Sequence, residues 1–194
     1  VLRGPDDAAA LRNAMQTTTT AVVIGGGYIG LEAAASFAKA GLAVHVIEVA
    51  DRLLARVASP DMSAFFMALQ QHHGVQLHMG AARTDIHHRD GHFNGVTLAD
   101  GQHIAAELLV VGIGVAPDSA LAEAVGAATG NGILVDRHMR TTIDDIYAIG
   151  DVALIDGAAL RIESVHNAQD TAARAAADMT KTPPPENAIP WFWS

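Results

Sequence analysis

Between residues 20 and 48 the chain alternates short apolar runs with one longer amphipathic segment. In order it contains an apolar run (21–24), a glycine cluster (25–27), an alanine-rich stretch (about 28–40), a second apolar run (43–47) and Glu48. Apolar β-branched runs of this length favour buried strands, and the longer stretch between them is typical of a helix. The pattern predicts a strand–turn–helix–strand unit that ends on an acid.

The rest of the chain predicts four more helices, four short strands and a meander. Helices are expected at 5–15, from Ser59 to about residue 73, at 118–125 and at 166–179, and strands at 75–78, 107–111, 132–135 and 146–149. Segments at 83–88, 92–98 and 102–104 are separated by Asp90-Gly91 and Asp100-Gly101. Because type I′ hairpin turns favour Asp-Gly, we interpret these segments as an antiparallel meander that replaces a second crossover helix.

Three glycines in the first unit have the spacing of a dinucleotide-binding turn. Gly25 permits the turn off the strand, Gly27 lets the backbone approach a pyrophosphate, and Gly30 lets the helix lie close to the strand. Tyr28 and Ile29 begin the helix, whose first N–H groups would point at the phosphates. The alternative is a glycine-rich turn in another α/β fold, but the strand, the helix and the following acid all favour a nucleotide site.

Glu48 follows the first of these glycines by roughly 20 residues, where such sites place the acid that binds ribose. Its carboxylate can accept both hydroxyls of the adenine ribose. A 2′-phosphate in contact with it would cost up to about 4 kcal/mol at an effective dielectric constant near 20. The sequence therefore predicts NAD(H) rather than NADP(H), although Arg52 or Arg56 could offset part of that penalty.

Composition restricts the alternatives. The 194 residues carry a net charge of −9 and are 50% hydrophobic, which predicts a globular protein with no affinity for nucleic acid or for an anionic membrane. No apolar run is long enough to span a membrane and no signal peptide is visible, so a cytoplasmic location is expected. The absence of cysteine excludes a redox disulfide or a Cys-ligated cluster in this chain. Since it starts at Val1 and stops just after an aromatic cluster, we expect an internal piece of a longer protein.

Four separated stretches resemble one family. They are GGGYIGLEAA (25–34), VVGIGVAPD (110–118), TTIDDIYAIGDV (141–152) and RIESVHNAQDTA (161–172). Together they are similar to the two-dinucleotide flavoproteins of the pyridine nucleotide-disulphide oxidoreductase superfamily. The last stretch, followed by PWFWS (190–194), most resembles the ferredoxin reductases of bacterial oxygenase systems, of the putidaredoxin reductase and aromatic-dioxygenase reductase type.

The resemblance implies an α/β, Rossmann-like, three-layer fold in which a β-meander forms the crossover. Residues 17–115 would form the NAD(H)-binding domain, and residues 1–16 and 116–194 part of an FAD-binding domain. The first FAD glycine motif and the C-terminal domain would lie outside this chain. NADH would reduce FAD, and FAD would pass electrons to an iron–sulfur ferredoxin, expected to be of the [2Fe-2S] type. The oligomeric state is left open.

Several site residues follow from the resemblance, each with a simpler alternative. Glu32 would orient the nicotinamide, or is an exposed acid near a helix N-terminus. The Gly112-Ile113-Gly114 segment would put bare backbone beside the dinucleotide, or is a crossover between domains. Arg56 would contact the pyrophosphate or adenine, or is a solvated surface arginine.

The FAD residues implied by the resemblance lie in the second half of the chain. Gly150 and Asp151 would receive the ribityl chain, or form a turn at the end of a strand. His166, Ala168 and Gln169 start a helix whose N-terminus would lie near the flavin ring. Trp193 would flank the isoalloxazine, or is a core tryptophan.

The ten histidines suggest metal binding, but they are scattered along the chain without the spacing of a metal site, so no metal is expected. Three other functions remain open within the superfamily: NADH oxidase, coenzyme A disulfide reductase, and the flavoprotein part of a nitrite reductase. Outside enzymes, the chain by itself could be an NAD-binding module without turnover.

Overall fold

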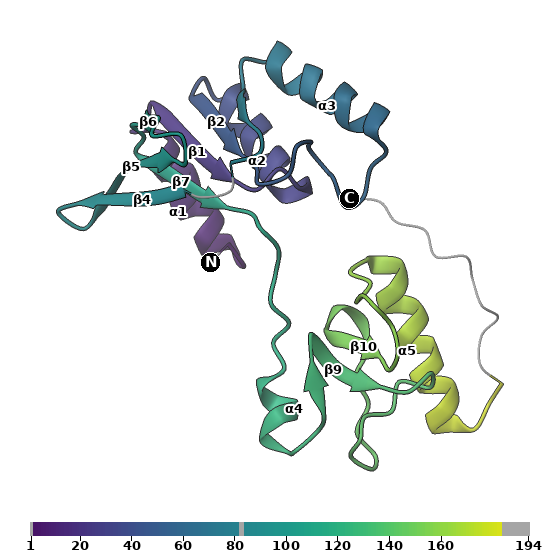
Figure 1. Cartoon of the computed structure of the whole chain (residues 1–194). Coiled ribbons are helices and arrows are strands. Elements are labelled where there is room, and N and C mark those ends of the chain that lie inside the picture. Colours follow the sequence, from purple (N-terminus) through teal and green to yellow (C-terminus); the bar gives the residue numbers. More distant parts are fainter. Residues whose placement is uncertain (1, 82–83, 184–194) are drawn as a thin grey trace. The chain divides into compact units, whose positions relative to one another are not determined.

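The computed structural model describes residues 2–81 and 84–183, and the chain divides into two compact units, Val1–Gly114 and Val115–Ser194 (Figure 1). Each unit is described by itself. None of the helices in the described ranges combines the length and the apolar composition needed to cross a membrane.

The centre of the first unit is a four-stranded sheet. Its strands are β1 (Thr20–Ile24), β2 (Ala43–Ile47), β3 (Gln76–His78) and β7 (Leu108–Val111), in the order β3-β2-β1-β7. All three pairings are parallel. Strand β1 is central and has a completely buried middle, which explains why its sequence is a continuous apolar run rather than an alternating one.

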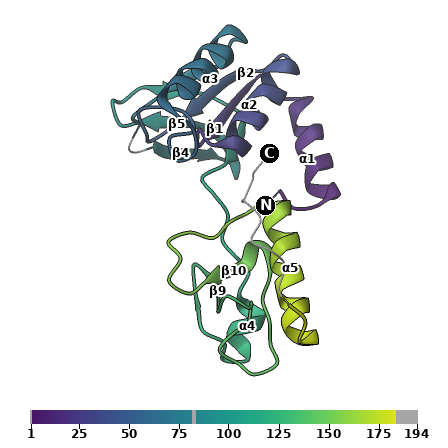
Figure 2. The same cartoon turned by 90° about the vertical axis from the view of Figure 1, so that its right-hand side faces the viewer.

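Helices cover one face of this sheet (Figure 2). They are α1 (Pro5–Met15), α2 (Tyr28–Lys39) and α3 (Pro60–His72). The buried face of α2 carries Leu31, Ala34 and Phe37, which recur at helical spacing and pack on the odd-numbered residues of β1. Ser59 caps α3, where its side-chain oxygen accepts a hydrogen bond from the Met62 N–H at 3.3 Å.

The predicted meander covers the opposite face. Strands β4 (Thr84–Arg89), β5 (His92–Leu98) and β6 (His103–Ile104) pair antiparallel in the order β4-β5-β6. Val96 and Ile104 of the meander pack with Val22 and Ile47 of the sheet. The first unit is therefore three layers, helices, parallel sheet and meander, which confirms the fold class expected from the sequence.

The second unit is smaller. It contains a sheet of β8 (Thr129–Gly130), β9 (Gly132–Val135) and β10 (Ala153–Ile155), in the order β10-β9-β8. A short helix α4 (Ala120–Ala124) and a long helix α5 (Val165–Thr180) accompany it, and a 3₁₀ turn covers Gly150–Val152. Met139, Val135 and Ala175 lie in its core.

One predicted strand is wrong. The stretch 146–149 makes a single bridge, between Arg140 and Tyr147, and is not a strand. The backbone groups of this stretch bond to the preceding loop instead. The Thr141 N–H donates to the Ile146 carbonyl, and the Ala148 N–H donates to the Met139 carbonyl. The apolar stretch therefore closes a loop, and the strand that pairs in parallel with β9 is the unpredicted β10, shortly after Asp151.

The division of the chain into cofactor domains stays a prediction. The first compact unit ends at Gly114, and helix α1, which we assigned with residues 1–16 to the FAD domain, packs on the core of the first unit through Leu11 and Met15.

Candidate functional site

The carboxyl ends of three parallel strands converge at one edge of the first unit (Figure 1). From β1 the chain moves to β2 and β3 on one side, and later returns to β7 on the other side. Open parallel sheets bind ligands at such a reversal of strand order. The segments that follow the three strands here are Gly25–Gly27, Glu48 and Gly112–Gly114, which the sequence analysis assigned to the dinucleotide.

Close packing explains the glycine at two positions of the turn. A Cβ at Gly30 would lie 2.0 Å from the Gly25 carbonyl oxygen. Gly25 has a left-handed backbone (φ +110°), and a Cβ there would lie 2.4 Å from the Gly112 carbonyl oxygen. The Gly112 N–H in turn donates to the Ile24 carbonyl at 2.7 Å. The turn, the start of α2 and the end of β7 therefore fit together only without side chains at Gly25 and Gly30.

Gly27 differs from these glycines because protein packing does not require it. A Cβ built at Gly27 would have no heavy atom within 4 Å. Gly27 is also the N-cap of α2, and as a glycine it supplies no side-chain cap to the first N–H groups of that helix. Open space beside uncapped N–H groups fits a pyrophosphate.

Glu48 is held in place by the backbone on both of its oxygens. Its Oε2 accepts the Gly26 N–H at 2.5 Å, and its Oε1 accepts the Ala50 N–H at 2.8 Å. The Gly26 carbonyl accepts the Leu54 N–H at 2.9 Å, so both polar groups of Gly26 are occupied. Each carboxylate oxygen can accept a further hydrogen bond, so Glu48 can still bind ribose hydroxyls. Sequence reasoning missed this second role of Glu48 in fixing the glycine turn.

The two arginines after β2 have different surroundings. Arg52 donates to the Ala55 and Ala58 carbonyls, at 2.7 and 2.8 Å, and to the Ser63 hydroxyl at 2.8 Å. It closes the loop between β2 and α3, so its guanidinium is committed to the fold. Arg56 is exposed. Of these two arginines, only Arg56 has a side chain that a ligand could engage without breaking that loop.

The remaining candidates of this unit lie around the glycine turn. Glu32 is exposed on α2, in agreement with either of its two interpretations. Ile29 and Ile113 have 55% and 68% of their surface exposed. Tyr28 is half-buried and packs on the core beneath α2. The exposed apolar side chains give this edge a surface for the flat rings of a dinucleotide.

In the second unit the structure brings the Gly150–Asp151 turn onto the side of α5. Gly150 is buried with a left-handed backbone (φ +69°), and a Cβ there would lie 3.5 Å from the Ala168 Cβ. The Gly150 N–H donates to the Thr171 Oγ1 at 2.9 Å. Asp151 is exposed. Gly150 therefore packs against α5 while the next residue, Asp151, is exposed, and the binding of FAD by this turn stays a prediction.

The start of α5 carries the other predicted flavin residues. Ser164 caps the helix, its oxygen accepting the Asn167 N–H at 3.1 Å. His166 is half-buried and Gln169 is exposed. A pocket of about 100 Å³ lies beside these turns, lined by residues that include Ile155, His166 and Arg174. It is far smaller than the roughly 300–1,000 Å³ of a typical ligand cavity, so it does not enclose a flavin. The predicted contact of Trp193 lies outside the described residues.

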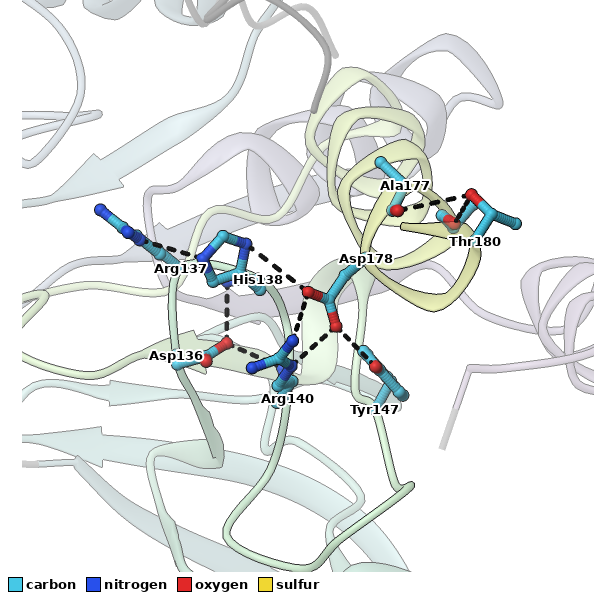
Figure 3. Close-up of polar contacts among 9 residues, drawn as sticks. Asp136, Arg137, His138, Arg140, Tyr147, Ala177, Asp178 and Thr180 are labelled. Carbon is cyan, nitrogen blue, oxygen red and sulfur yellow. Dashed lines mark hydrogen bonds and ion pairs between the residues drawn. The ribbon is translucent and has the colours of Figure 1, made fainter. Parts of the chain in front are cut away.

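The far end of α5 is tied to the loop before Gly150 (Figure 3). The Asp178 carboxylate accepts two hydrogen bonds from the Arg140 guanidinium, at 2.5 and 2.7 Å, and one from the Tyr147 hydroxyl at 2.6 Å. Hydrogen bonds from Arg140, and then from Tyr147, lower the pKa of Asp178. The hydrogen bond to Asp178 raises the pKa of Tyr147. This group anchors the segment that leads into the turn.

Two of the ten histidines, His45 and His78, pair across adjacent strands of the parallel sheet. His45 Nδ1 and His78 Nε2, on adjacent strands, lie 3.0 Å apart, and burial lowers the pKa of both rings. Within residues 2–81 and 84–183, no three histidine or carboxylate side chains come together in an arrangement that could hold a metal ion.

Similarity to known proteins covers the whole chain. The chain is 44% identical over 179 residues to the ferredoxin reductase subunit of 5,5'-dehydrodivanillate O-demethylase from Sphingobium sp. This match covers 89% of the chain and 43% of the relative. It is 43% identical to rhodocoxin reductase from Rhodococcus erythropolis over 197 residues, covering 100% of this chain and 46% of the relative. The chain thus spans about half the length of the curated relatives it matches.

Solved structures give the same result. The ferredoxin reductase of the CYP199A2 system from Rhodopseudomonas palustris matches with a TM-score of 0.90 and 41% identity, covering 99% of this chain and 48% of that one. Putidaredoxin reductase, in its covalent complex with putidaredoxin, matches with a TM-score of 0.87 and 37% identity, covering 100% and 48%. The expected resemblance to ferredoxin reductases is confirmed. Residues 1–172 match the family of pyridine nucleotide-disulphide oxidoreductases, and the chain belongs to that family.

Proposed function

We propose that this chain supplies the NAD-binding part and a portion of the FAD-binding part of an NADH-dependent flavoprotein reductase that passes electrons to a ferredoxin of an oxygenase system. The observation that carries the proposal is identity of 44% and 41% to two relatives that are named as ferredoxin reductases. Because the chain spans about half of those relatives, the full site for FAD would need residues beyond this chain.

Each unit contributes side chains and backbone toward one cofactor. Gly27 and the first N–H groups of α2 would hold the pyrophosphate of NADH, Glu48 its adenine ribose, and Glu32 would orient its nicotinamide. Asp151 would bind the ribityl chain of FAD. When bound, the two cofactors supply the electron-transfer chemistry, and the residues of this chain hold and orient them.

The domain boundaries belong to the same proposal. Residues 17–115 would bind NADH, and residues 1–16 with 116–194 would belong to the FAD domain. The separation of the compact units at Gly114 and Val115 supports a boundary at that point.

The partner would be a small iron–sulfur protein, for which we propose a [2Fe-2S] ferredoxin. Putidaredoxin, which is bound to one structural relative, supports a ferredoxin. Another relative, 40% identical, is named rubredoxin-NAD(+) reductase, so the two kinds of acceptor need to be compared directly. We also propose a cytoplasmic location, where NADH is available.

The test uses the full-length protein that carries this chain. NADH-dependent reduction of cytochrome c should require added ferredoxin, and it should be slow with rubredoxin in its place. Fast oxygen consumption with NADH alone would indicate an NADH oxidase and overturn the proposal. NADH-dependent reduction of coenzyme A disulfide, without any need for ferredoxin, would overturn it as well.

A further inference from the structure

Two side chains hold the backbone of the turn that presents Asp151. The Gly150 N–H donates to Thr171 Oγ1 at 2.9 Å, and the Asp151 carbonyl accepts a hydrogen bond from the Arg161 guanidinium. Asp151 itself is exposed. The turn is therefore held through two main-chain groups, while Asp151 stays exposed.

Thr171 is well suited to this contact. It lies within α5 and is only 3% exposed. Its hydroxyl donates to the Asn167 carbonyl at 2.7 Å, which leaves its oxygen free to accept the Gly150 N–H. A threonine in the middle of a helix that bonds back to the preceding turn is slightly unfavourable for the helix. The residue is therefore better explained by its contact with Gly150 than by helix stability.

Arg161 is placed at some cost to folding. Its side chain is 5% exposed and pairs with the Glu163 carboxylate at 2.7 Å, yet its Nε is buried with no hydrogen-bond partner in the described part of the chain. Gly132 leaves the room for it, because a Cβ at that position would lie 2.6 Å from the Arg161 Cδ. Buried charges with unsatisfied N–H groups are often less stable than an apolar side chain of similar size. Stability alone therefore does not account for Arg161.

We propose that Thr171 and Arg161 are positioning residues that hold the Gly150–Asp151 turn in the conformation that receives FAD. This inference rests on the proposed function, since it takes FAD as the ligand of Asp151. Neither side chain needs to touch the cofactor. Each acts through one main-chain group of the turn, Thr171 through the Gly150 N–H and Arg161 through the Asp151 carbonyl.

The first experiment measures FAD affinity of the full-length protein by fluorescence titration of FAD-free material. Thr171→Val keeps the shape of the side chain but removes the acceptor for the Gly150 N–H. The dissociation constant for FAD should rise at least about tenfold. Thr171→Ser restores a hydroxyl and should return the constant to within about threefold of the wild type. The matched control is Thr180→Val on the same helix, whose hydroxyl also bonds back, to the Ala176 carbonyl at 2.7 Å, and which should leave the constant unchanged.

The second experiment separates positioning from stability. Arg161→Met removes the buried charge while keeping most of the side-chain volume. Unfolding of the FAD-free variant in urea should be unchanged or shifted to higher urea, whereas its dissociation constant for FAD should rise at least about tenfold. The Michaelis constant for NADH should stay within about twofold of the wild type, because Arg161 lies outside the unit that carries the dinucleotide turn.

Clear outcomes would overturn the inference. If Thr171→Val and Arg161→Met bind FAD as tightly as the wild type, the two residues do not position the turn. If each variant loses stability and affinity in parallel, and Thr171→Ser fails to restore affinity, their role is structural only. If the wild-type full-length protein binds no FAD, the proposed function fails first, and that result is recognised before any variant is compared.

Discussion

Gly27→Ala is expected to weaken nucleotide binding while leaving the fold nearly unchanged. A methyl group at this position would meet no heavy atom within 4 Å, so the substitution creates no steric clash inside the protein. The cost to stability is limited to the weaker N-cap, which is about 1 kcal/mol or less. The methyl group would, however, fill the open space that we assign to the pyrophosphate, and each charged hydrogen bond lost there is worth about 1.5–3 kcal/mol.

Gly30→Ala is the opposing control. Its Cβ would lie 2.0 Å from the Gly25 carbonyl oxygen, which belongs to the backbone and cannot rotate away. Overpacking of this kind costs typically 1–3 kcal/mol, and we expect about 3 kcal/mol here because the clash is with main chain. Urea unfolding and calorimetric titration with NADH would be measured for both variants.

The expected pattern is specific to each glycine. Gly27→Ala should unfold close to the wild type and bind NADH at least about tenfold more weakly, whereas Gly30→Ala should unfold at clearly lower urea. If Gly27→Ala bound NADH with wild-type affinity, the pyrophosphate would not lie at this turn, and the assignment of the glycine motif would be refuted.

Two further predictions concern stability. Asp178→Asn weakens the charged contacts with Arg140 and should lower the thermal unfolding midpoint. The control Asp170→Asn removes an ion pair within α5, between Asp170 Oδ2 and Arg174 Nε at 2.9 Å, and should lower the midpoint less. Equal shifts would contradict the anchoring role of Asp178. The pKa of His45 and of His78 is lowered by burial, and Asp100 offsets part of this effect for His78. In the unfolded chain these rings have a pKa of about 6.5, so they take up protons at a higher pH than in the folded protein, and stability should fall as the pH drops below that value. A His45→Gln, His78→Gln double variant, followed by urea unfolding between about pH 5 and pH 7, should lose part of this dependence; an unchanged slope would argue against the pair.

The first unit could be predicted well because its signals are local. The apolar runs, the glycine turn and the Asp-Gly turns each specify their own backbone, and the predicted strand at residues 43–47 is β2 as found. Asp90 and Gly91 both have the left-handed backbone that a type I′ turn requires, whereas at Asp100-Gly101 only the glycine has it, so the second turn is of another type. Here local preference and tertiary structure agree.

Contacts between distant residues could not be predicted in the same way. Glu48 was predicted from its spacing to bind ribose, but its bond to the Gly26 N–H depends on how β2 lies beside β1. Asp178 and Arg140 are 38 positions apart, and no sequence motif pairs them. The apolar stretch 146–149 has the composition of a strand, yet the segment before it turns back and takes up its hydrogen bonds through Met139 and Thr141.

The affinity of the wild-type chain for NADH and NADPH tests the account most directly. Glu48 is fixed by two backbone N–H groups and cannot easily swing away from a 2′-phosphate. Calorimetric titration with both nucleotides should show NADH binding at least about tenfold more tightly, since tenfold corresponds to about 1.4 kcal/mol, roughly a third of the repulsion of up to about 4 kcal/mol expected between a carboxylate and a phosphate in contact. Equal affinity for the two nucleotides, or no binding of either, would contradict a site built from the glycine turn and Glu48.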